Sequence, residues 1–200
     1  MNSFDDKAKE WDKPDRVKMA SEIMQAMLLE LKLNREMTII DLGAGTGLIA
    51  SELSKKVKKV IALDSSEGML AILKDKILVK GLNNITTAVF DAEKDTPEKY
   101  HADIIISSMA MHHIKNTEEF AVKLYTMLNL EGKIAIADLE KEDGSFHGEN
   151  AVGIMHNGFD MSELAKSFES AGFKEIKFTH AYTLQKTGRE YKIFLMTGKK

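Results

Sequence analysis

The sequence predicts one α/β domain with a doubly wound, mostly parallel seven-stranded sheet that ends in an antiparallel hairpin. Two observations carry this prediction. Short apolar segments alternate with segments of helical periodicity along most of the 200 residues, which requires parallel strands covered by helices on both faces. The last two apolar segments follow one another with no helical pattern between them, so they should form an antiparallel pair at the sheet edge.

The individual elements follow from local patterns. Apolar runs bounded by turn residues predict strands, and apolar residues at helical spacing predict helices. In chain order we expect a helix at 15–33, a strand at 37–43, a helix at 46–56, a strand at 58–64, a helix at 66–79, strands at 84–90 and 102–108, a helix at 117–128, a strand at 132–139, a helix at 160–171 and strands at 175–184 and 191–197. No linker-like stretch divides the chain, so we expect residues 1–200 to form a single domain.

The helix at 160–171 has the clearest boundaries. Asp160 and Glu163 have the spacing of a capping box, and Gly172 supplies a stop. The segment 185–190 has the composition of a turn and should join the last two strands.

Composition excludes several classes of function. The chain has no cysteine, which removes disulfides, thiolate metal sites and a cysteine nucleophile. With 28 basic and 31 acidic residues and a net charge of −3, it lacks a bulk basic field for nucleic acid. No apolar run approaches the ~20 residues of a membrane span, and the acidic-polar start is unlike a signal peptide. We therefore expect no membrane insertion, no nucleic-acid partner and no metal site. A cytoplasmic location is the default expectation, and we expect a monomer or homodimer.

A glycine-rich loop, DLGAGTG at 41–47, lies where the first strand meets a helix. Glycines there allow positive φ and close approach of the backbone to a ligand, while free helix N–H groups point at the bound group. Asp64 closes the next strand, where an acid can accept both ribose hydroxyls of an adenosine. Leu48 occupies the position of the last small residue in the dinucleotide fingerprint, so the loop suits a smaller ligand head than a pyrophosphate.

Five ordered segments resemble the motifs of the class I S-adenosylmethionine-dependent methyltransferases. These are DLGAGTG, ALDSSEGML, FDAEK, ADIIISSMAMHHI and LNLEGKIAIADL. The terminal hairpin is also a feature of their Rossmann-like fold. The opening FDDKAKEWD resembles the small-molecule branch that includes quinone-biosynthesis enzymes, in which the N-terminal segment folds over the cofactor.

The resemblance implies a site for S-adenosyl-L-methionine. Carried over to this sequence, it places Gly43, Ala44 and Gly45 at the methionine part of the cofactor, with Asp41 organising the loop and the ammonium group. It places Asp64 at the ribose, with Ser65 and Met69 beside it. It places Asp91 and Ala92 at the adenine edge, and Ser107 and Ser108 near the sulfonium. We expect residues 1–33 to form a helical lid, with Trp11 over the cofactor; simple packing of Trp11 is the alternative.

The methyl acceptor should lie beyond the carboxyl ends of the strands. His112 and His113 directly follow the fourth strand, and the glycine-containing segment 140–159 should reach over the same opening. We expect His112 or His156 to act as a general base. Met109, His113, His147 and Asn157 are the expected contacts of the substrate. Packing of His113 and solvation of His147 are the alternatives.

The sequence thus predicts methyl transfer to a small organic acceptor with an oxygen, nitrogen, sulfur or activated carbon nucleophile. The chain has no Asn/Asp-Pro-Pro-aromatic motif after the fourth strand, which disfavours the nucleic-acid amino-methylating enzymes that resemble this fold. Two alternatives remain open. One is a noncatalytic S-adenosylmethionine-binding module; the other is an NAD-dependent oxidoreductase, which Leu48 and the terminal hairpin disfavour.

Overall fold

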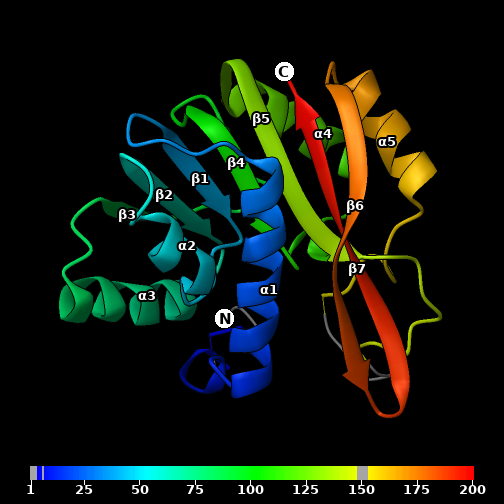
Figure 1. Ribbon diagram of the computed structural model, residues 1–200, viewed down its shortest axis with the longest axis horizontal. Helices are drawn as coiled ribbons and strands as arrows, with labels where there is room; N and C mark the ends of the chain where they lie inside the picture. Colours follow the sequence, from blue (N-terminus) through cyan, green and yellow to red (C-terminus); the bar gives the residue numbers. More distant parts are fainter. Residues whose placement is uncertain (1–3, 6, 148–152) are drawn as a thin grey trace.

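The computed structural model describes residues 4–5, 7–147 and 153–200, and in them a single mixed sheet flanked by helices (Figure 1). The elements are η1 (Ala8–Glu10), α1 (Pro14–Glu30), β1 (Thr38–Leu42), α2 (Leu48–Leu53), β2 (Lys59–Asp64), α3 (Glu67–Lys80), β3 (Ile85–Val89), β4 (Ala102–Ser108), η2 (Met111–His113), α4 (Thr117–Met127), β5 (Leu128–Leu139), α5 (Met161–Ser170), β6 (Lys174–Lys186) and β7 (Arg189–Lys199). None of the described helices is long and apolar enough to cross a membrane.

The sheet has seven strands in the order β3-β2-β1-β4-β5-β7-β6. Strands β1 to β5 are parallel, and β7 pairs antiparallel with both β5 and β6. The predicted fold class is therefore confirmed. The strand order reverses between β1 and β4, so these two neighbours end side by side at the point where ligands bind in such sheets.

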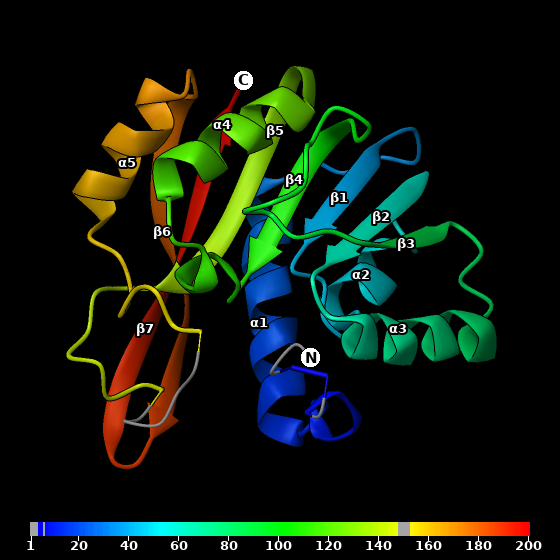
Figure 2. The ribbon, with the colours of Figure 1, turned by 180° about the vertical axis from the view of Figure 1, so that it is seen from behind.

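Two hydrophobic clusters hold the layers together. On one face, α1, α2 and α3 pack against the sheet with residues such as Ile23, Leu53 and Leu73. On the other face, α4 and α5 contribute Phe120 and Phe168 (Figure 2). Because both faces are covered, the middle of the central strands β1 and β4 is apolar, and their polar residues lie toward the strand ends.

Several predicted boundaries differ from the structure: α1 ends at Glu30 rather than at 33, and β5 begins at Leu128 rather than at 132. Two further boundaries are wrong for backbone reasons. Helix α2 begins at Leu48 rather than at residue 46, because Gly47 adopts φ 77°, outside the helical region. The hairpin turn is also shorter than 185–190: β6 and β7 pair up to Lys186 and Arg189. Only two residues connect them, both at positive φ, as tight hairpin turns require.

Candidate functional site

The glycine loop after β1 has the backbone that its sequence predicts. Gly43, Gly45 and Gly47 have φ values of 77°, 54° and 77°, a region that residues with a Cβ rarely adopt. A Cβ on Gly43 would lie 2.5 Å from the Cβ of Ala110. The loop therefore sits directly against the segment that leaves β4, at the reversal of the strand order.

Asp64, at the end of β2, holds this loop in place. Its Oδ2 accepts a hydrogen bond from the Gly45 N–H at 2.7 Å, and its Oδ1 accepts one from the Ser66 N–H at 2.8 Å. Burial raises the pKa of this carboxyl, and the two N–H donors act in the opposite direction. Asp64 thus links the glycine loop to the start of α3, where Met69 is buried.

Asp41 is a buried carboxyl at the end of β1. Its Oδ2 has no hydrogen-bond partner among the described residues. Burial, and then the nearby charge of Asp64, raise the pKa of Asp41 to about 7. An uncompensated carboxyl oxygen in such a place suits a cationic ligand group. The Oγ of Ser107, near the end of β4, is likewise buried without a described partner, and Ser108 next to it is half-buried.

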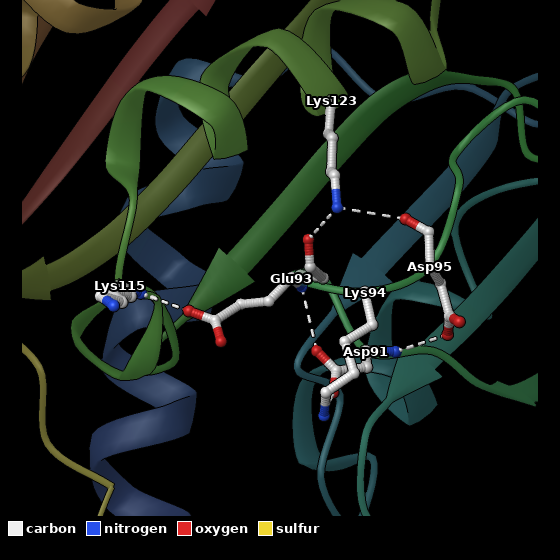
Figure 3. A network of polar contacts seen from close by, with 7 residues as sticks. Asp91, Glu93, Lys94, Asp95, Lys115 and Lys123 are labelled. Atoms are coloured by element: carbon white, nitrogen blue, oxygen red, sulfur yellow. Dashed lines mark hydrogen bonds and ion pairs between the residues drawn. The ribbon is translucent and has the colours of Figure 1, made fainter.

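The loop after β3 carries Asp91 and is internally bonded (Figure 3). Asp91 Oδ1 accepts the N–H of Glu93 at 3.0 Å, and Asp91 Oδ2 lies 2.6 Å from Lys94 Nζ. Burial raises the pKa of Asp91, but these hydrogen bonds outweigh it, so that the pKa is lowered overall. Asp91 is therefore a carboxylate at neutral pH. Ala92 is half-buried beside it.

A cluster of three imidazoles lies beyond β4 and β5. His112 Nδ1 is 2.7 Å from Asp138 Oδ1, with side-chain exposures of 2% and 0%. Asp138 also accepts the N–H groups of His112 and Leu139. The ring of His112 lies 4.2 Å from that of His113 and 4.8 Å from that of His147, between centroids.

The two neighbouring imidazoles are neutral at pH 7. Burial, and then the proximity of His112, lower the pKa of His113. Burial, followed by His112 and His113, lowers the pKa of His147 to about 4. His147 Nε2 is buried without a described partner. No group of three or more His, Cys, Asp or Glu side chains in the described part of the chain could hold a metal ion.

The described parts of the segment 140–159 close one side of this cluster. The backbone N–H groups of Met155 and His156 both donate to the carbonyl of His112, at 2.9 and 3.1 Å. His156 Nε2 is 2.9 Å from the carbonyl of Ile114. Asn157 accepts the N–H of Glu142 through its backbone. Residues 148–152, within the expected substrate loop, lie outside the described residues.

Met109, the residue after β4, is bonded to the neighbouring strand β5. It has φ 54°, and its N–H donates to the carbonyl of Ala137 at 2.9 Å. Met109 is thus a half-buried residue with positive φ directly after β4.

The segment before α1 reaches the glycine loop. Asp12 Oδ1 accepts from Thr46 Oγ1 at 2.5 Å, and Asp12 Oδ2 pairs with Lys76 at 2.5 Å. Asp5 accepts from Ser66 Oγ at 2.6 Å and from the N–H of Gly68 at 3.0 Å. The N-terminal segment is thereby attached to the glycine loop and to α3.

Two aromatic residues of that segment lie near the glycine loop and the histidine cluster. The ring of Phe4 lies 5.8 Å from Trp11 and 5.1 Å from His113, between centroids. Trp11 Nε1 is 3.9 Å from the point where a Cβ on Gly45 would lie. Within the expected lid 1–33, α1 packs Ile23 into the core, so the expectation of a lid is left to the segment before α1.

Sequence reasoning missed four residues of this arrangement. Asp138, Asp5, Asp12 and Thr46 were not expected at the site, although Asp138 ends β5 as Asp41 and Asp64 close their strands. Its position near the end of a predicted strand could therefore have indicated Asp138 as a site residue. The contacts of Asp5 and Asp12 span 30 or more residues of sequence, and no local pattern predicts them.

Comparison with known proteins places the chain in a family. Residues 15–186 match the model of a methyltransferase domain family. An uncharacterized methyltransferase of Schizosaccharomyces pombe is 29% identical over 149 residues, 68% of this chain and 52% of that protein. A malonyl-[acyl-carrier protein] O-methyltransferase of Bacillus cereus is 29% identical over 117 residues, 58% of this chain and 42% of that protein. The chain thus spans about half the length of the curated relatives it matches.

Solved structures agree on the fold. A SAM-dependent methyltransferase from Aquifex aeolicus superimposes with a TM-score of 0.72 at 22% identity, covering 98% of this chain and 97% of that one. The chain therefore belongs to the methyltransferase domain family, and its fold is that of the class I S-adenosylmethionine-dependent methyltransferases.

Proposed function

We propose that this protein transfers a methyl group from S-adenosyl-L-methionine to a small organic acceptor. The observation that carries the proposal is the glycine loop at the reversal of the strand order, bonded to Asp64 and adjoined by the unpartnered oxygen of Asp41. Family membership supports the same reaction and sets aside the nicotinamide oxidoreductase alternative.

The residues present fit this cofactor. Asp41 offers a buried acceptor to the ammonium group, Asp64 offers a carboxylate to the ribose hydroxyls, and Asp91 offers one to the adenine amine. Gly43, Ala44 and Gly45 are then the backbone at the methionine part, with Ser65 and Met69 beside the ribose, Ala92 beside the adenine, and Ser107 and Ser108 toward the sulfonium. When bound, S-adenosylmethionine supplies an electrophilic methyl group.

The residues of the chain then have two tasks, to exclude water and to manage the proton of the acceptor. Because a carboxylate only accepts hydrogen bonds, His112 Nδ1 carries the hydrogen in its pair with Asp138. In the neutral ring, Nε2 is left as the atom that can take a proton. We assign the base to His112 before His156, whose Nε2 donates to a carbonyl and which has no described carboxylate partner.

Several observations favour a small acceptor. His113 contacts Phe4 of the N-terminal segment, His147 contacts His112, and Asn157 binds the backbone of Glu142; with Met109 they are the residues that we propose contact the acceptor. The net charge of −3 argues against a nucleic acid, and we expect a cytoplasmic monomer or homodimer. One relative is named for O-methylation of malonyl-[acyl-carrier protein], which makes carboxylates a class to include in a screen.

The experiment is a screen of small acceptors with S-adenosylmethionine, in which release of S-adenosylhomocysteine is measured against a blank without acceptor. The panel should contain phenols, amines, thiols and carboxylates. Acceptor-dependent release supports the proposal. Tight binding of the cofactor with no release from any acceptor would instead favour a noncatalytic binding module, and absence of cofactor binding would refute both.

Cofactor affinity is expected to depend on pH through Asp41. Below pH 7 the carboxyl of the free protein is protonated, and binding of an ammonium group must displace that proton. Affinity for S-adenosylhomocysteine should therefore rise about tenfold per pH unit toward pH 7 and level off above it. Asp41→Asn should flatten this profile. Calorimetry from pH 5 to pH 8 measures it, and an equally steep profile in Asp41→Asn contradicts the assignment.

The N-terminal segment should hold the bound cofactor. Deleting residues 1–12 removes Trp11 and the contacts of Asp5 and Asp12 with the loops below them. We expect about tenfold weaker binding of S-adenosylhomocysteine, mainly through faster dissociation. Asp15→Asn, an exposed change in the first turn of α1, is the control. Unchanged affinity after the deletion would show that Trp11 merely packs.

A further inference from the structure

The loop that carries Asp91 is fastened to helix α4 by one side chain. Lys123 Nζ donates to the carbonyl of Ala92 at 2.6 Å and to the carbonyl of Asp95 at 3.1 Å. Figure 3 shows Lys123 reaching from α4 to both carbonyls. Within the part of the chain that the structure describes, no carboxylate forms an ion pair with Lys123, so its charge is directed at this loop.

The contact with Ala92 acts on Asp91 through a single peptide unit. The carbonyl of Ala92 and the N–H of Glu93 belong to the same planar group, in which they point in opposite directions. Lys123 binds the oxygen of that group, and Asp91 Oδ1 accepts its N–H at 3.0 Å. Fixing the oxygen therefore fixes the direction of the N–H that binds Asp91 Oδ1; the other oxygen, Oδ2, is bound by the exposed side chain of Lys94.

The rest of the loop gives this arrangement a rigid frame. The N–H of Asp91 donates to Asp95 Oδ2 at 2.8 Å, and the N–H of Asp95 donates back to the carbonyl of Asp91 at 2.8 Å. Glu93 Oε1 accepts the backbone N–H of Lys115 at 2.7 Å. The loop is thus held from α4 at one point and from the segment before α4 at another.

We propose that Lys123 is a positioning residue for nucleobase recognition: through the Ala92–Glu93 peptide it orients the Asp91 carboxylate toward the exocyclic amine of adenine. This inference rests on the proposed placement of adenine at Asp91. It adds a determinant of base selectivity that lies on a helix and does not itself touch the ligand.

The test compares two ligands that differ only in the base. S-adenosylhomocysteine carries the exocyclic amine, and S-inosylhomocysteine carries a carbonyl oxygen in its place, which an ionised Asp91 repels. We expect the wild-type protein to prefer the amine form by at least about tenfold. Lys123→Met should weaken S-adenosylhomocysteine about fivefold to tenfold and leave the inosine analogue nearly unchanged, so that the preference falls to about twofold.

Two variants serve as controls for the charge and the donor. Lys123→Arg keeps a cationic donor and should restore most of the preference. Lys115→Met removes a nearby charge but keeps the backbone N–H that binds Glu93, and it should leave the preference unchanged. Thermal unfolding without ligand shows whether Lys123→Met is folded, and a preference ratio is independent of the folded fraction.

The outcomes separate this inference from the proposed site. If Asp91→Asn abolishes the preference but Lys123→Met retains it, Lys123 has no positioning role and the adenine placement stands. If Asp91→Asn also retains the preference, adenine does not lie at Asp91, and both ideas are overturned.

Discussion

Replacing Asp64 with asparagine should weaken binding of S-adenosylhomocysteine about 100-fold. The carboxylate would face the two ribose hydroxyls while it holds the N–H groups of Gly45 and Ser66. An amide has a single acceptor oxygen, so ribose contacts and loop contacts compete for it. Loss of two charge-assisted hydrogen bonds, at roughly 1.5 kcal/mol each, corresponds to about two orders of magnitude in affinity.

Calorimetry with purified variants measures this effect. Asp75→Asn is a matched control, because Asp75 is an exposed aspartate on α3 and its replacement should not change affinity. Undiminished binding by Asp64→Asn would remove the ribose site from β2, and with it the central element of the proposed function.

Disrupting the His112–Asp138 pair should have the second large effect, on turnover. His112→Gln removes the atom proposed to take the proton, and a general base contributes about 10²–10⁴ in rate. We expect kcat to fall by that order with an acceptor found in the screen, while S-adenosylhomocysteine still binds. His101→Gln changes an exposed histidine that precedes β4, at the opposite end of the strand from the cluster, and should leave kcat unchanged.

Asp138→Asn removes the other partner of the pair, and measuring both its stability and its turnover separates an effect on catalysis from an effect on folding. Breaking a buried pair by removing one partner costs about 3–5 kcal/mol, so this variant should also unfold more readily. Asp138 in addition accepts two backbone N–H groups. If His112→Gln and Asp138→Asn both lose stability but keep full turnover per folded molecule, the pair only anchors the strand ends. The base must then be sought elsewhere, first at His156.

Much of the site could be predicted because it depends on local rules. Asp41 and Asp64 lie at the ends of predicted strands, the glycine loop and Asp91 come directly after predicted strands, and parallel strands bring their carboxyl ends to one edge. Their positions in the chain therefore determined their positions in space. The longer hairpin and the start of α2 at Leu48 were missed because pairing between strands and the φ of Gly47 decide those boundaries.

The sequence by itself determined the order of the elements, the fold class, the family and the acids that close the strands, since each depends on neighbouring residues or on short motifs. Tertiary structure alone decided which distant groups meet. Asp138 meets His112 because β5 lies beside β4, Asp12 meets Thr46 because α1 starts next to the glycine loop, and Lys123 meets Ala92 across α4 and the end of β3. These contacts result from the packing of whole layers, and a pattern confined to a few residues does not encode them.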